Sequence, residues 1–165
     1  MRALLVVLAA TALLMTASCK TTSQRAAQAR TPDETCLAWS DAYVETVLTV
    51  AAGWRRDEPM AAAYLVGDDS WPASERRRAA IGDAGNRACM AAMADRTTDG
   101  SVLDGACEAQ ARQAAFAGAE PVLRAQARRA GLTGGAGAAD PLVAASAVAS
   151  VYAEGYDACI AGDAG

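Results

Sequence analysis

The positions of the prolines constrain the fold of this chain more than any other feature, because each of the five stands where a helix is expected to begin. In "TPDE", Pro32 follows Thr31, and Glu34 lies three residues after the threonine, which is the pattern of a capping box. The other prolines directly precede Met60, Ala73, Val122 and Leu142. Apolar residues between these starts recur at helical spacing, and no useful stretch alternates as a strand does. The sequence therefore predicts an all-α bundle of five or six helices.

The first and last of the expected helices carry the clearest apolar stripes. On a helical wheel with 100° per residue, one half of the first expected helix carries the apolar residues Cys36, Leu37, Trp39, Tyr43, Val44, Val47, Leu48, Val50 and Trp54. The set in the last helix is Val148, Tyr152, Tyr156, Cys159 and Ile160. The middle helices, the second of them starting at Ser101, have weaker stripes: Ile81, Ala88, Cys89 and Ala92, then Leu103, Cys107, Ala111 and Ala114. These faces predict a single domain over residues 32–165, with a glycine-rich linker at 131–139.

Four of the five cysteines lie on the predicted apolar faces: Cys36, Cys89, Cys107 and Cys159. Four cysteines allow three pairings. Cys89 precedes the turn "DRTTDGS" by about as many residues as Cys107 follows it. If the two helices formed an antiparallel hairpin, both cysteines would therefore lie at the same level along it. This interpretation predicts the disulfides Cys89–Cys107 and Cys36–Cys159, the second between the first and last helices. Much of the apolar content is alanine, which buries little area, and a thin core gains from such cross-links.

Residues 1–18 have the pattern of an export signal. The segment "ALLVVLAATALLMTA" runs from Ala3 to Ala17 without a charge, behind Arg2. A helix of that length rises about 22 Å, less than the roughly 30 Å of a bilayer core, which is typical of a secretory signal rather than of a membrane span. The next segment, residues 19–31, is polar and predicts a flexible tether.

The end of the signal, "MTASC", resembles the lipobox of bacterial lipoproteins, with Ala17 and Ser18 at its two small positions and Thr16 where leucine is usual. In that family the cysteine receives a diacylglycerol and becomes the new N-terminus, which implies lipidation of Cys19 and a palmitate-type anchor. Because Lys20 rather than aspartate follows, the resemblance implies the outer membrane of a Gram-negative envelope, facing the periplasm. Each buried CH₂ of an acyl chain contributes about 0.8 kcal/mol to membrane binding, so several acyl chains would anchor the protein firmly in the membrane. Ordinary cleavage near Ser18 is the alternative, and it predicts a soluble secreted or periplasmic protein.

Composition excludes several classes of function. The chain has no histidine, so it lacks the commonest general base and metal ligand, and a serine–histidine triad is excluded. No CxxC pair indicates a metal site, and neither a metal nor a cofactor is expected. A formal charge of −4 gives no electrostatic reason to bind nucleic acid. The loop "DRTTDGSVLDGACE" is not a calcium loop, because Ala106 stands where a bidentate glutamate is required.

The segment "YLVGDDSWP" places two carboxylates between aromatic residues in an expected loop, and tryptophan is enriched in binding hot spots. The candidate interface comprises Trp54, Tyr64, Asp68, Asp69 and Trp71. The competing structural interpretation is that Trp71 packs on the core while the aspartates face water near a helix N-terminus. Arginines 76–78, 124, 128 and 129 predict solvated faces, with contact to anionic head groups or an acidic partner as the alternative.

Three classes of function remain open. The first is a membrane-anchored envelope lipoprotein that binds another protein without catalysis, as inhibitors, immunity proteins and assembly factors do. The alternative is a carrier of a lipid or small apolar ligand, which requires a pocket of roughly 300 Å³ or more. The distant third is a hydrolase that uses carboxylates alone, although no pair is marked by its spacing. We therefore expect no enzymatic activity, a membrane contact through the acyl chains, and a protein partner.

Overall fold

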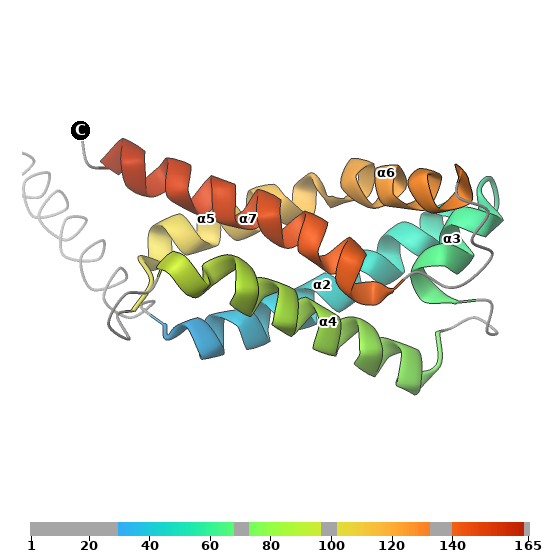
Figure 1. Ribbon diagram of the computed structural model, residues 1–165, viewed down its shortest axis with the longest axis horizontal. Coiled ribbons are helices and arrows are strands. Elements are labelled where there is room, and N and C mark those ends of the chain that lie inside the picture. Colours follow the sequence, from blue (N-terminus) through green and yellow to red (C-terminus); the bar gives the residue numbers. More distant parts are fainter. Residues whose placement is uncertain (1–29, 68–72, 97–101, 133–139, 164–165) are drawn as a thin grey trace, which may run out of the picture.

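The computed structural model describes residues 30–67, 73–96, 102–132 and 140–163 (Figure 1). Their elements are α2 (Pro32–Trp54), α3 (Pro59–Val66), α4 (Glu75–Met93), the short 3₁₀ helix η1 (Ala94–Arg96), α5 (Gly105–Ala117), α6 (Ala119–Leu132) and α7 (Pro141–Asp163). No strand occurs within these ranges, so the prediction of an all-α bundle of five or six helices is confirmed. The predicted signal, Cys19 and the tether up to residue 29 lie outside the described residues.

Prolines begin α2, α3 and α7 as the sequence predicts, whereas α6 begins at Ala119, two residues before Pro121. Pro32, Pro59 and Pro141 are the first residues of α2, α3 and α7. At the start of α2, the Glu34 backbone N–H donates to Thr31 Oγ1 at 3.3 Å, and the Thr31 N–H donates to Glu34 Oε2 at 3.1 Å. This reciprocal pair satisfies two donors that the first turn of a helix leaves without intrahelical partners.

Helix α5 begins at Gly105, later than the predicted start at Ser101. The reason is Asp104, whose Oδ1 accepts hydrogen bonds from the backbone N–H groups of Ala106 and Cys107, both at 2.9 Å. A carboxylate that satisfies two first-turn donors is a stronger helix start than the serine upstream.

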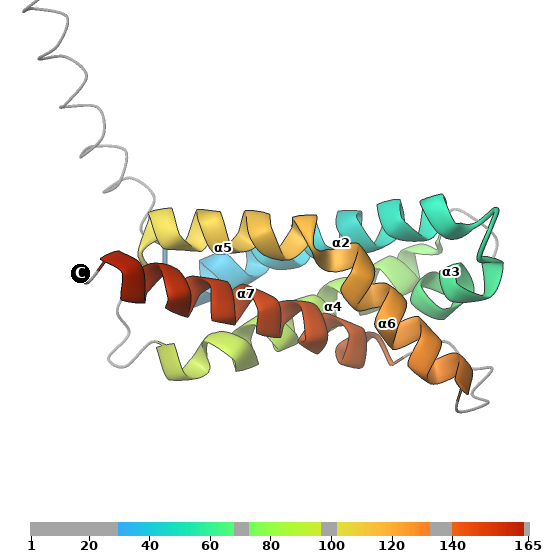
Figure 2. The ribbon, with the colours of Figure 1, turned by 90° about the horizontal axis from the view of Figure 1, so that it is seen from above.

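Helices α2, α4, α5 and α7 form a bundle in which α2 and α5 run one way along the long axis while α4 and α7 return (Figures 1 and 2). Helix α4 packs chiefly on α2 and α7, and α5 packs on α7; α3 and α6 pack together at one end. In the core, the Trp39 ring stacks on Tyr43, with centroids 5.2 Å apart. It also meets Phe116 at 5.2 Å and Tyr152 at 6.0 Å, so this aromatic cluster joins α2, α5 and α7.

The disulfides connect Cys36 to Cys89, between α2 and α4, and Cys107 to Cys159, between α5 and α7. The predicted pairs Cys36–Cys159 and Cys89–Cys107 are therefore wrong. The four cysteines do lie at one end of the bundle, but α4 and α5 do not form the expected hairpin, because α4 packs on α2 and α7 while α5 packs chiefly on α7 rather than on α4. Each disulfide joins two helices that pack side by side, α2 with α4 and α5 with α7.

The two disulfide-linked halves repeat a local sequence. The segment "DETC" ends at Cys36 and "DGAC" at Cys107, while "GNRAC" ends at Cys89 and "GYDAC" at Cys159. The bonded cysteines are 53 residues apart in the first half and 52 in the second. The chain thus contains two similar units, each an antiparallel helix pair closed by one disulfide.

A glycine lies beside each disulfide, four residues before the second cysteine of each unit. An added β-carbon on Gly85 would lie 3.5 Å from Ser40 Cα on the facing helix, and one on Gly155 would lie 3.5 Å from Ala111 Cα. Ser40 and Ala111 each follow the first cysteine of their unit by four residues. The two helices therefore approach closely at the same place in both units.

Candidate functional site: a groove at the distal end of the bundle

The described chain enters the bundle at Arg30, and the opposite end, here called the distal end, is formed by the end of α2, by α3 and by α6 (Figures 1 and 2). A surface groove of about 290 Å³ opens there. Its lining comes from α2, the α2–α3 connection and α6: Thr49, Val50, Gly53, Trp54, Asp57, Glu58, Glu120 and Arg124. We call it the Trp54 groove.

Trp54, the last residue of α2, forms a wall of the groove. Its side chain is only 4% exposed, so it packs as a core residue. The indole N–H donates to Glu120 Oε1 at 3.1 Å, and the Arg124 guanidinium lies over the ring, with Cζ 4.8 Å from the centroid. One aromatic side chain thus positions both a carboxylate and a cation.

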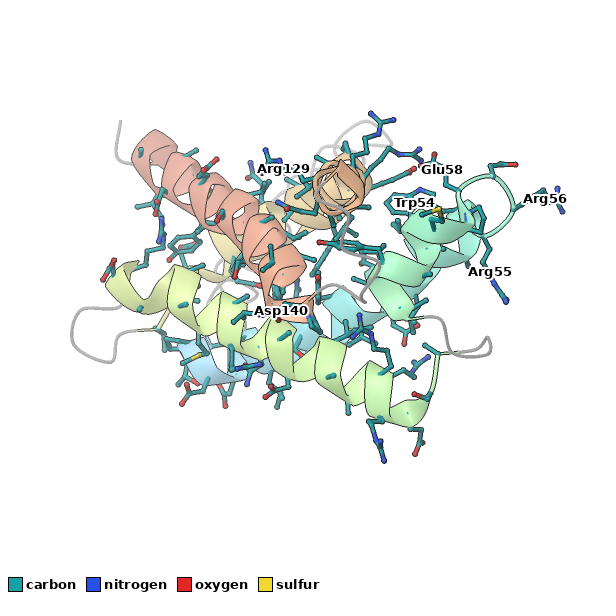
Figure 3. All side chains as sticks on the ribbon, turned by 45° about the vertical axis from the view of Figure 1, so that its right-hand side comes forward. Trp54, Arg55, Arg56, Glu58, Arg129 and Asp140 are labelled. Carbon is teal, nitrogen blue, oxygen red and sulfur yellow. A yellow bond between two sulfur atoms is a disulfide. The ribbon has the colours of Figure 1, made fainter. Side chains whose placement is uncertain are left out.

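Arg124 joins α6 to the α2–α3 connection. Its guanidinium donates to Oε1 of Glu58, the residue before α3, and to Oε1 of Glu120, one turn earlier on α6, at 2.8 Å in the second case. Figure 3 shows Trp54 and Glu58 extending from the connection toward α6. The half-buried guanidinium is therefore held between two carboxylates and an aromatic face.

These contacts also set the charge state of Glu120. The hydrogen bond from the Trp54 indole, followed by the one from Arg124, lowers the pKa of the Glu120 carboxyl. The same carboxylate raises the pKa of Arg124. Glu120 is consequently an ionised acceptor at neutral pH, the opposite of what a general acid needs.

Of the predicted interface residues, the structure places Trp54 in the groove and Tyr64 elsewhere on the distal end. Tyr64 lies on α3 and is not part of the groove lining. Desolvation raises the pKa of the Tyr64 hydroxyl, and the charge of Asp140, the residue before α7, adds to the effect. Asp68, Asp69 and Trp71 lie outside the described residues.

Sequence reasoning missed Glu58, Glu120 and Arg124 as a cluster. The prediction that Arg124 belongs to a wholly solvated face is wrong, because Trp54 and the two glutamates hold it half-buried. The spacing of four residues between Glu120 and Arg124 on one helix was a visible signal. That this pair meets Trp54 and Glu58 depends on the packing of α6 near α3.

No family model matches the chain, and neither the curated proteins nor the solved structures contain a match. Across the described ranges, no helix has both the length and the apolar character needed to cross a bilayer. The same residues include no group of three or more acidic or cysteine side chains arranged to hold a metal ion. The groove and the N-terminal sequence are therefore the features of the protein that indicate a function.

Proposed function

We propose that the protein is a membrane-anchored lipoprotein of the bacterial cell envelope whose helical domain binds another protein without catalysing a reaction. The observation that supports this most is the position of the Trp54 groove, at the opposite end of the bundle from Arg30. Helix α2 alone, with 23 residues, spans about 34 Å between these ends. A chain anchored at Cys19 would then present the groove away from the lipid.

The character of the groove favours protein binding over carriage of an apolar ligand. At about 290 Å³ it lies at the lower end of the range for small-molecule pockets, and charged side chains supply half of its lining residues. A lipid tail would have to desolvate these charges without compensation. A single side chain of a protein partner, with polar neighbours at the rim, matches both the size and the polarity.

The groove residues also favour binding over catalysis. Glu120 is held ionised by Trp54 and Arg124, and both glutamates are engaged by the same guanidinium. A carboxylate-only hydrolase needs one carboxyl group that keeps its proton near neutral pH. A fixed ion-pair cluster instead offers a preorganised surface for recognition.

Site-specific photo-cross-linking tests the protein-binding role. A photoreactive amino acid replaces Thr49, an exposed residue at the edge of the groove, in the full chain expressed in the cells that encode it. The matched control carries the same residue at Ser150, which is also helical and exposed but lies outside the groove lining. We expect a discrete protein adduct from position 49 alone; no adduct, or the same adduct from both positions, would contradict the proposal.

Palmitate labelling tests the anchor. Wild-type chain should incorporate the label and sediment with membranes, whereas Cys19→Ala should do neither. Lys20→Asp is the control, since it leaves the acylated cysteine in place and should change only which membrane holds the protein. Equal incorporation into wild type and Cys19→Ala would show that the lipobox resemblance does not extend to this chain.

A further inference from the structure

We infer that the Trp54 groove receives an arginine side chain of the protein partner. The inference rests on the proposed protein-binding function and specifies the chemistry that the groove recognises. Its starting point is Arg124, whose guanidinium already lies on the Trp54 ring between two carboxylates. The carboxylates of the groove thus already bind one guanidinium, and their remaining acceptor sites are the ones that a second guanidinium would use.

The charge of the groove remains negative with Arg124 in place. Asp57, Glu58 and Glu120 line it together with that single cation, which leaves a formal charge of −2. Arg124 engages one oxygen, Oε1, of each glutamate, and their side chains are still 38% and 53% exposed. A carboxylate has about four lone-pair sites, so both can accept further hydrogen bonds from an incoming donor.

The shape of the groove suits the stem of an arginine. Val50 supplies an apolar wall, and Gly53 leaves space beside it, because an added β-carbon there would meet no atom within 4 Å. Methylene groups can lie along this surface while the charged head remains at the carboxylates. Arginine fits better than lysine, because its planar fork pairs with carboxylates through two hydrogen bonds.

Other arginines of the distal end do not fill the groove. Arg55 and Arg56 extend from the α2–α3 connection away from Trp54, and Arg129 extends from the side of α6 opposite Glu58 (Figure 3). Charge complementarity with Asp57, Glu58 and Glu120 selects a partner surface that presents an arginine.

The test is an NMR titration of the full chain in detergent micelles with the peptide acetyl-Gly-Arg-Gly-amide. The reporter is the Trp54 indole N–H resonance, assigned by its loss in Trp54→Phe. We expect a saturable shift with this peptide and an affinity about tenfold lower with the citrulline peptide, which has the same shape and no charge. An equal response to the citrulline peptide, or no saturable shift with the arginine peptide, would overturn the inference.

Variants separate groove binding from other effects. Gly53→Leu fills the groove and should abolish the shift, whereas Gly162→Leu, a matched helical glycine outside the groove lining, should leave it unchanged. Glu58→Gln keeps the shape and should weaken binding by about tenfold, which gives a second variant if Gly53→Leu fails to fold. Unchanged binding in Glu58→Gln and in a folded Gly53→Leu would place the arginine elsewhere.

The two proposals fail in distinguishable ways. A specific adduct at position 49 together with a flat arginine titration would leave protein binding supported and remove the arginine inference. Saturable arginine binding without any adduct in the envelope would support the chemistry of the groove and count against the proposed protein partner.

Discussion

Gly85 of α4 lies so close to Tyr43 of α2 that a β-carbon on the glycine would sit 2.9 Å from the Tyr43 Cδ1 atom. Tyr43 is buried and stacks on Trp39, so its ring has little room to move. We expect Gly85→Ala to lower the free energy of unfolding by about 1–3 kcal/mol, since this overpacking exceeds the gain in helix propensity. Urea denaturation followed by circular dichroism measures the change.

Gly155→Ala is the matched variant in the second unit and should behave differently. Its added β-carbon would lie 3.5 Å from Ala111, which is an ordinary van der Waals contact. We expect unchanged stability or a gain of up to about 1 kcal/mol, because alanine is the better helix former. Equal losses at Gly85 and Gly155 would show that close approach at Tyr43 is not the cause.

The disulfide pairs are directly measurable. Peptide mapping under non-reducing conditions should yield Cys36–Cys89 and Cys107–Cys159. Replacing both cysteines of either pair by alanine should cost about 4 kcal/mol in the chain-entropy model, because the separations of 53 and 52 residues are nearly equal. A peptide that links Cys36 to Cys159 would contradict the structure, as would double variants of very different stability.

Glu120 should titrate below the ordinary glutamate value of about 4.3. Because its folded pKa is lowered, its stabilising effect is present above the unfolded value and disappears as pH falls through the folded pKa. Trp54→Phe removes the indole donor, the largest cause, and should raise the Glu120 pKa toward the ordinary value. NMR titration of the side-chain carboxyl carbon measures this, with Tyr64→Phe as the control expected to leave the value unchanged.

Asp104 should make a measurable contribution to the start of α5. Asp104→Ala removes the acceptor of two backbone N–H groups and should cost about 1–2 kcal/mol. Asp104→Asn keeps an acceptor oxygen at the same position and should recover most of the loss. If asparagine is no better than alanine in thermal denaturation, the cap is not what the aspartate provides.

The sequence predicted the helices well because local signals determine them. Prolines, caps and the 3.6-residue period identify α2 and its buried Trp39 and Tyr43. The same wheel placed Leu37 on the apolar half, yet its side chain is 62% exposed. A half wheel covers 180°, whereas the face that contacts the core is narrower, so residues at its edge remain in water. The predicted linker at 131–139 starts too early, since α6 runs to Leu132.

The positions of the cysteines along the bundle axis did not predict which helices are neighbours. Equal levels are compatible with any pairing of Cys36, Cys89, Cys107 and Cys159, and packing alone decides which helices adjoin. The repeats "DETC" and "DGAC", with "GNRAC" and "GYDAC", would have assigned one disulfide to each unit. The groove was missed for the same reason, because Arg124 meets Glu58 only through the packing of α6 beside α3.

The placement of both disulfides near Arg30 divides the bundle mechanically. A load applied through the N-terminus reaches covalent bonds first, so the entry end keeps its fold under tension. The distal end, with the eight-residue helix α3, depends on packing and ion pairs, and its amides should exchange with heavy water sooner than those beside Cys36 and Cys89. The end that is closed by covalent bonds and the end that is held by packing and ion pairs are therefore physically separate.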